Sequence, residues 1–169
     1  MSTTHTTIDT PLGRLILVAE DETLSGVYFP GHWTRPDPAT FGARTERRLA
    51  QVEQQLAEYF AGERTSFDLP TAVAGTAFQR QVWDLIARIP YGETTTYGQL
   101  ARELGDPTLA RQVGNAVAHN PLSVIVPCHR VVGKDGSLTG YAGGLSRKRF
   151  LLDLEGAPVR AASAAPALF

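Results

Sequence analysis

The chain has 169 residues, of which 43% are hydrophobic and 20% are charged, a composition typical of a globular protein with one large or two small domains. Its longest apolar run near the N-terminus, Leu15–Ala19, is too short for a signal peptide or a membrane span, so we expect a cytoplasmic protein without a membrane partner. The formal net charge of −1 by itself argues against a nucleic-acid-binding protein.

Residues 1–75 predict a small α/β domain in which a helix covers an antiparallel sheet. Three strand-like runs separated by turn residues occupy the start of the chain: Thr3–Asp9, Arg14–Glu20 and Leu24–Phe29. Residues 30–42 are rich in proline and glycine and favour a loop. Residues 44–60 carry apolar side chains at helical spacing and predict a helix, and residues 67–69 show one further strand pattern.

Residues 76–156 predict a second, mainly helical domain. It begins with a helix pattern at residues 78–89, and residues 134–136 have the composition of a hairpin turn. Ser146 can cap a last helix whose inward side chains are Phe150, Leu151 and Leu154. The remaining tail, residues 157–169, is rich in alanine and proline, and we expect it to be flexible.

The middle of this second domain has the signals of a helix-turn-helix. Thr96 with Gln99 three residues later is a capping-box signature, and Gly105 can end the helix that follows. Asp106 as N-cap and Pro107 at the first helical position can start another helix at once. Two short helices joined by a tight turn are typical of this motif, although a helical hairpin without a ligand fits the pattern equally well.

The helix after Pro107 has two contrasting faces. Its inward positions follow the spacing i, i+4, i+7 and i+8: Leu109, Val113, Ala116 and Val117. The outward positions are nearly bare: Arg111, Gly114, Asn115 and Ala118. A major-groove reader presents several long polar side chains, whereas small residues with one arginine suit close approach to a backbone, with the arginine free to enter a groove or the base stack.

The two predicted domains differ in charge. Residues 1–75 carry a net −4 and residues 76–156 a net +2, so only the second domain could face phosphates. We expect any such binding to be sensitive to salt but not strongly electrostatic.

Cys128 is the only cysteine, which excludes an internal disulfide. The four histidines are too scattered for a structural zinc site, and we expect neither a metal nor a cofactor. A lone cysteine can be a buried small hydrophobe or a nucleophile. A histidine with an orienting carboxylate could supply the roughly 2 kcal/mol needed to ionise a thiol at neutral pH, and His129 and Glu155 are the candidates.

Four stretches of the second domain make the chain recognisable: "PCHRVVG", "TGYAGGLSRKRFLLDLEG", "IPYGETTTYGQLA" and "ARQVGNAVAHNP". Across residues 76–156 the sequence resembles the O6-alkylguanine-DNA alkyltransferases, also called methylated-DNA-protein-cysteine methyltransferases. Residues 1–75 resemble the family's variable N-terminal domain only in length and expected elements, and they lack its zinc cluster. The resemblance implies an α+β protein, in which a small α/β domain precedes a winged helix-turn-helix-like domain that holds the active site.

The resemblance also implies a reaction. The chain would repair DNA by moving the alkyl group of O6-alkylguanine irreversibly to Cys128, being consumed once per lesion, and O4-alkylthymine is a further conceivable substrate. His129 would activate the thiol through a water, and Glu155 would orient the imidazole. Asn120 matches the residue that ties the turn before the active-site segment, and Tyr97 matches the general acid that donates to the guanine ring.

On the same grounds the partner is double-stranded DNA, contacted through the minor groove by a monomer that could bind cooperatively. The implied DNA-binding residues are Arg111, Tyr97, Gly114, Asn115 and Ala118. Arg111 would fill the stack after the damaged base is flipped out. The implied pocket residues are Val131, Tyr141, Ala142 and Ser123. Gln112 departs from the family pattern, which commonly has alanine there.

Three other functions are compatible with parts of this pattern. An alkyltransferase-like protein would bind lesions without reacting, but such proteins lack the acceptor cysteine. A Cys-His hydrolase would use the same three residues and turn over repeatedly, leaving the helix-turn-helix without a role. A transcription factor with an inert thiol would need a sequence-reading helix that this chain does not offer.

Overall fold

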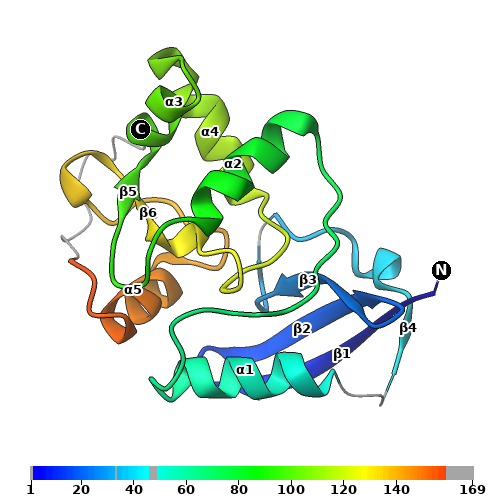
Figure 1. Ribbon diagram of the computed structural model, residues 1–169. Coiled ribbons are helices and arrows are strands. Elements are labelled where there is room, and N and C mark those ends of the chain that lie inside the picture. The colour runs from blue at the N-terminus through cyan, green and yellow to red at the C-terminus, as the bar shows by residue number, and fades with distance from the viewer. Residues whose placement is uncertain (1, 33, 46–48, 159–169) are drawn as a thin grey trace. The chain divides into compact units, whose positions relative to one another are not determined.

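The computed structural model describes residues 2–32, 34–45 and 49–158. It divides into two compact units: Met1–Ala74 with Pro121–Ile125, and Gly75–Asn120 with Val126–Phe169. The fold is α+β, as the sequence predicts (Figure 1). No helix in the described part of the chain is long and apolar enough to span a membrane.

The first unit is built around a four-stranded sheet of order β3-β2-β1-β4. Its strands are β1 (Thr3–Thr10), β2 (Gly13–Glu20), β3 (Thr23–Tyr28) and β4 (Ala43–Arg44). The first three pair antiparallel, which confirms the predicted meander, and β4 pairs parallel to β1. Helix α1 (Ala50–Phe60) runs along this sheet and buries Val52, Leu56 and Tyr59 (Figure 1).

Two local predictions for this unit are wrong, and the predicted loop is confirmed in its described residues apart from one short turn. The helix begins at Ala50 rather than at residue 44, because Arg44 pairs with His5 at the edge of the sheet; residues 46–48 lie outside the described residues. The predicted loop contains a short 3-10 helix, η1 (Pro38–Phe41), capped by the Asp37 carboxylate. Residues 67–69 form no strand, and the chain instead bridges to β3 at Thr71, where Ala72 N donates to Leu24 O.

The short segment Pro121–Ile125 belongs to the first unit although it lies within the stretch expected to form the second domain. It adds to the edge of β3, where Val27 N donates to Pro121 O at 2.8 Å and Val27 bridges to Leu122. Val124 in this segment has φ of +72°, a conformation that is rare and strained for a β-branched residue.

The second unit contains four helices among its described residues: α2 (Ala77–Ala87), α3 (Tyr97–Glu103), α4 (Ala110–Ala118) and α5 (Leu145–Leu154). Its short strands β5 (Thr95–Thr96) and β6 (Val131–Val132) pair in parallel. Three 3-10 turns connect these elements: η2 (Pro107–Leu109), η3 (Cys128–Arg130) and η4 (Lys134–Gly136).

Local signals explain where the helices of this unit begin. A complete capping box of Thr76 and Gln79 starts α2, and Trp83 on that helix donates its indole N–H to the carbonyl of Ala116 in α4 at 2.8 Å. Thr96 caps α3 by accepting from Gln99 N. The predicted helix-turn-helix is present, with Asp106 capping the η2 turn that leads into α4.

The C-terminal part of the unit differs from prediction in four places. The η4 turn does not form a hairpin, because β6 pairs in parallel with β5. Helix α5 begins after Gly144, at φ +96°, rather than at a Ser146 cap. Its buried side chains include Lys148, while Phe150 is 37% exposed. Ala157, assigned to the flexible tail, is buried with Val132, Leu138 and Leu152, and residues 159–169 lie outside the described residues.

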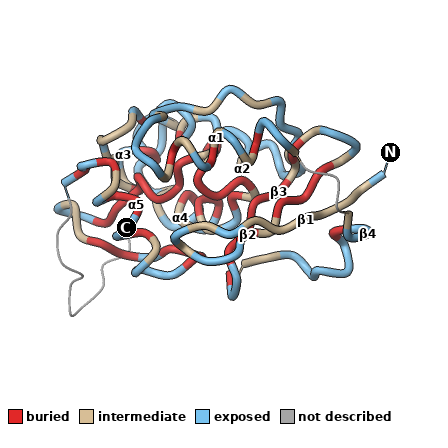
Figure 2. Tube along the Cα trace, turned by 90° about the horizontal axis from the view of Figure 1, so that it is seen from below, coloured by how far each residue is buried: buried red, intermediate tan, exposed pale blue. Residues whose placement is uncertain are grey.

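Figure 2 shows the buried stretches of the chain in red. In the second unit they include most of the run from Val126 to Val132, so the segment that carries the thiol is part of the core. Polar side chains in such a place lose their contacts with bulk water, so leaving them without a partner costs free energy.

Candidate active site

Cys128 lies in η3, directly after Pro127, and is only 6% exposed. Its backbone N–H donates to Val126 O at 2.8 Å, and its carbonyl accepts from Val131 N. Asn120, at the end of the segment that leaves α4, donates its side-chain N–H to the same Val126 carbonyl at 2.8 Å. This hydrogen bond links Asn120 to the residue that follows the segment Pro121–Ile125. It thereby fixes the backbone that precedes the thiol.

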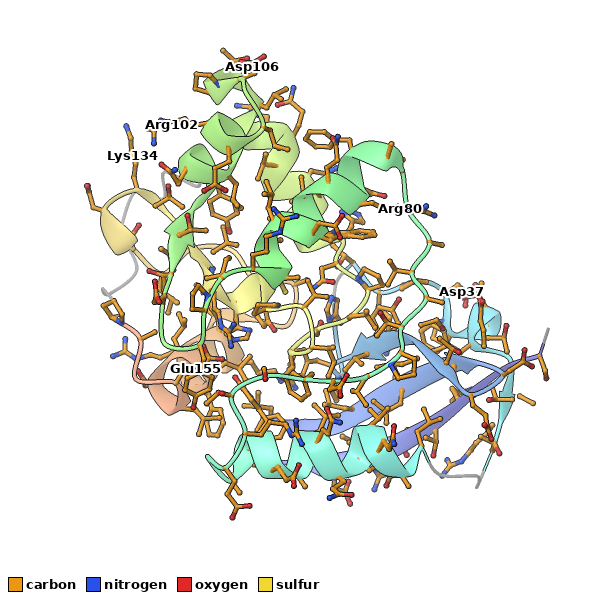
Figure 3. The ribbon with its side chains drawn as sticks, viewed as in Figure 1. Asp37, Arg80, Arg102, Asp106, Lys134 and Glu155 are labelled. Atoms are coloured by element: carbon orange, nitrogen blue, oxygen red, sulfur yellow. The ribbon has the colours of Figure 1, made fainter. Side chains whose placement is uncertain are left out.

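His129 and Glu155 form a fully buried pair. His129 Nε2 lies 2.8 Å from Glu155 Oε2, and both side chains are 0% exposed. Figure 3 labels Glu155 just after the last turn of α5. Because an ionised carboxylate can only accept, Nε2 must carry the hydrogen, which leaves Nδ1 as the acceptor. Nδ1 is buried and has no hydrogen-bond partner among the described residues, so it is available to take a proton.

Arg130 completes the surroundings of Glu155. Its Nε donates to Oε1 at 2.8 Å and its Nη2 to Oε2 at 2.9 Å, a bidentate pair. Its Nη1 donates to the carbonyl of Ile89 at 2.6 Å. The carboxylate of Glu155 therefore faces both an imidazole and a guanidinium inside the core.

Lys148 from α5 is a second buried cation and is 0% exposed. Its ammonium donates to the carbonyls of Val131 at 2.6 Å, Thr139 at 2.6 Å and Gly140 at 3.0 Å. Three carbonyls use all three donors of a lysine. Lys148 thus joins α5 to β6 and to the loop that leads to Tyr141. We call Cys128, His129, Arg130, Lys148 and Glu155 the acceptor cluster.

Burial dominates the electrostatics of this cluster. It raises the pKa of the Cys128 thiol, although Asn120, Lys148 and Tyr141 act in the opposite direction. The thiol is therefore neutral at neutral pH in the isolated protein, rather than ionised in advance as the sequence suggested. Burial likewise lowers the pKa of His129, against the pull of Glu155, so the imidazole is neutral. Burial lowers the pKa of Lys148 to about 8, and the neighbouring Cys128 partly offsets this shift.

Several other residues singled out from the sequence lie beside this cluster in the second unit. Tyr97, the first residue of α3, is 4% exposed; burial raises the pKa of its phenol and Cys128 raises it further, so the phenol keeps its proton. Three of the four expected pocket residues are buried in the same unit: Val131, Tyr141 and Ala142. The fourth, Ser123, lies in the segment Pro121–Ile125, which belongs to the first unit, so it is not part of this site.

The expected DNA-binding residues lie on the outer side of α4. Arg111, Gln112 and Asn115 are exposed, whereas Gly114 and Ala118 are half-buried. Val113, Ala116 and Val117 face the core, as their spacing predicts. The outer side of α4 therefore combines the long side chains of Arg111 and Gln112 with the short ones of Gly114, Asn115 and Ala118.

The two buried cations, Arg130 and Lys148, were not predicted from the sequence. Arg130 stands in the same short motif as Cys128 and His129, but an arginine next to a histidine gives no signal of its own. Lys148 could have been found, because it lies three and four residues before Leu151 and Leu152 and so shares their face of α5. No group of three or more His, Cys, Asp or Glu side chains within the described residues is placed to hold a metal ion.

Comparisons with known proteins cover both units. Family models match residues 3–73, described as "6-O-methylguanine DNA methyltransferase, ribonuclease-like domain", and residues 77–157, described as the "DNA binding domain" of the same family. A methylated-DNA-protein-cysteine methyltransferase of Mycobacterium tuberculosis is 46% identical over 159 residues, covering 89% of this chain and 91% of the relative. The constitutive methyltransferase of the same name from Bacillus subtilis is 44% identical over 156 residues, covering 89% and 94%.

Solved structures agree with these sequence matches. The crystal structure of Mycobacterium tuberculosis OGT in complex with DNA has a TM-score of 0.86 and 44% identity, covering 92% of this chain and 95% of that one. The M. tuberculosis O6-methylguanine methyltransferase crystal structure has a TM-score of 0.83 and 43% identity, covering 98% and 96%.

Proposed function

The chain belongs to the 6-O-methylguanine DNA methyltransferase family, and we propose that it repairs DNA by moving the alkyl group of O6-alkylguanine to its own Cys128. The assignment to Cys128 rests on one observation: this thiol is buried in the same cluster as the hydrogen-bonded pair His129–Glu155. The acceptor thus comes from the second unit, and we assign DNA binding and alkyl transfer to residues 76–156 and a supporting role to residues 1–75.

The neutral thiol requires a base at the moment of reaction. His129 Nδ1 is the free acceptor of the neutral imidazole, and it takes the thiol proton directly or through a water while Glu155 stabilises the resulting imidazolium. The sulfur then attacks the alkyl carbon, and the bond from that carbon to guanine O6 breaks. Lys148, as a nearby buried cation, favours the transient thiolate.

The electron pair of the broken bond passes to the guanine, which must gain a proton. Tyr97 supplies it to a ring nitrogen, since burial keeps its phenol protonated, and the proton on His129 finally replaces the one that Tyr97 gave. In sum, the thiol hydrogen ends on guanine and the alkyl group on sulfur. A thioether has no easy route back, so each molecule acts once.

Access to the base requires flipping it out of the duplex, because its reacting atom lies within the base stack. The short side chains of Gly114, Asn115 and Ala118 on α4 support close approach to the minor groove, with Arg111 filling the vacated place. Such a surface makes few contacts that depend on base sequence. This suits a protein that must find lesions in many contexts.

We propose that the protein works in the cytoplasm as a monomer. A lone buried thiol, with no disulfide to form, is compatible with a reducing compartment.

Intact-mass measurement tests this function directly. Purified protein is incubated with an excess of duplex containing O6-methylguanine, and the expected result is the gain of one methyl group, mapped to Cys128 by peptide analysis. A lesion-binding module would keep its original mass. A turnover hydrolase would release product without modification and beyond one equivalent. Either result would overturn the proposal.

A further inference from the structure

Arg130 has no part in the reaction as described above, yet it is one of the most constrained side chains of the second unit. It is 6% exposed and uses its Nε, Nη1 and Nη2 in hydrogen bonds of 2.6 to 2.9 Å. Its guanidinium carbon also lies 5.7 Å from the centre of the Tyr91 ring. Burying a guanidinium is costly, so a side chain held in this way calls for a function.

The target of Arg130 is the carboxylate that faces His129. Glu155 Oε2 accepts from Arg130 Nη2 at 2.9 Å and lies 2.8 Å from His129 Nε2, so the two partners share one oxygen. The other oxygen accepts from Arg130 Nε at 2.8 Å. The Ile89 carbonyl holds the far side of the guanidinium at 2.6 Å and thereby fixes the plane of the fork.

A carboxylate that is fully buried without a cation favours its protonated form. The Glu155 side chain is 0% exposed, and a neutral imidazole does not supply a positive charge. A guanidinium cannot be deprotonated in a protein, and its fork matches the two carboxylate oxygens. Arg130 therefore keeps Glu155 ionised, and Glu155 can only accept.

This matters because the state of Glu155 decides which nitrogen of His129 carries the hydrogen. A protonated Glu155 could donate to Nε2, and the imidazole would then carry its hydrogen on Nδ1 and be unable to accept the thiol proton. We propose that Arg130 is a positioning residue that holds Glu155 as an anion and so fixes His129 in the tautomer with hydrogen on Nε2. The proposal rests on the proposed function of His129 as the base.

The electrostatics of His129 are consistent with this role. Burial lowers its pKa, Glu155 raises it, and Arg130 lowers it again. The lowered pKa keeps the imidazole neutral, which is the state that can accept the thiol proton.

Nitrogen NMR of histidine tests the tautomer itself. The protein is labelled with 15N-histidine, and His129 is identified by its loss in His129→Gln. We expect hydrogen on Nε2 in the wild type and in Arg149→Met, which removes an exposed arginine of α5. We expect Arg130→Met to shift His129 toward hydrogen on Nδ1. A folded Arg130→Met protein with an unchanged His129 tautomer would falsify the proposal.

Transfer rates on free O6-benzylguanine give a second readout through a double-mutant cycle. We expect Arg130→Met to slow transfer about 10- to 100-fold, as loss of a supporting partner commonly does, and Arg130→Lys to keep the tautomer and recover part of the rate. In a Glu155→Gln background, adding Arg130→Met should change the rate less than about twofold, because Arg130 acts only through the carboxylate. An equal loss in both backgrounds contradicts the proposal.

These measurements remain informative if Arg130→Met does not fold. The double variant Arg130→Met/Glu155→Gln leaves no unpaired buried charge, and Arg130→Lys keeps the cation. With Arg130→Lys, a His129 that carries its hydrogen on Nε2 supports the proposal, and one that carries it on Nδ1 contradicts it. The NMR readout does not require alkyl transfer, so an inactive wild type would refute the proposed function without deciding the role of Arg130.

Discussion

The acceptor cluster and the outer face of α4 are built from opposite kinds of side chain. The cluster packs two cations, a carboxylate, an imidazole and a thiol into the core, where each charged group is held at hydrogen-bond distance. The face of α4 carries mostly small residues and one arginine. Chemistry on the alkyl group needs groups fixed in place before the substrate arrives, whereas binding of DNA of any sequence needs only a surface that comes close to it.

The largest expected effect is a complete loss of alkyl transfer while DNA binding is retained. Cys128→Ala removes the acceptor and should abolish alkyl transfer, because no second cysteine can replace it. Duplex binding, which depends on α4, should change less than about threefold by fluorescence anisotropy, since energies of sites without shared partners add nearly independently. Transfer that persists in the mass spectrum would show that another residue accepts the alkyl group.

Glu155→Ala should damage the cluster in both activity and stability. It leaves Arg130 as a buried cation without its carboxylate, and breaking such a pair costs about 3–5 kcal/mol. The free energy of unfolding in urea and the transfer rate measure the two losses. Asp153→Ala, an exposed position on α5 two residues before Glu155, is the matched control and should leave both nearly unchanged.

Arg111→Ala tests the other region. It should slow transfer from duplex DNA about tenfold or more, because no side chain then takes the place of the flipped base in the stack. Unstacking a base costs a few kcal/mol. Transfer from free O6-benzylguanine should stay within about twofold, since no stack is involved. Equal losses on both substrates would place Arg111 in the chemistry or in the stability of the fold.

A smaller effect should appear in the dependence of stability on pH. Burial lowers the pKa of His129, so below its ordinary pKa of about 6.5 the unfolded chain binds more protons at this site than the folded chain. Stability is therefore fully present above that pH and falls as the pH drops toward the lower pKa of the folded state. Urea denaturation at pH 7.5 and 5.5 measures the change. His129→Gln should reduce it, while His119→Gln, at an exposed position, should not.

The smallest effect is expected at Gln112, the departure from the family pattern on α4. Its side chain is exposed and outside the acceptor cluster. Gln112→Ala should leave transfer from the free base unchanged and alter duplex affinity by less than about threefold, within the range of exposed substitutions. A larger change in the rate of transfer from free O6-benzylguanine would show that the surface of α4 takes part in the chemistry.

Local sequence patterns were enough to predict the strands of the first unit, the helix-turn-helix and the two faces of α4. These features depend on period, caps and turn residues that act over a few positions, as Asp106 and Pro107 do before α4. The motif around Cys128 likewise indicated the family and the candidates His129 and Glu155.

How those candidates are held and charged depends on contacts between distant parts of the chain. Arg130 reaches Glu155 across 25 positions of the chain, Lys148 binds carbonyls of three residues on other segments, and Arg44 joins a strand because His5 lies beside it. Burial, which keeps both the thiol and the imidazole neutral, depends on everything packed around a residue. A local sequence pattern does not reveal how far a residue is buried, because the neighbours that exclude water are distant in the chain.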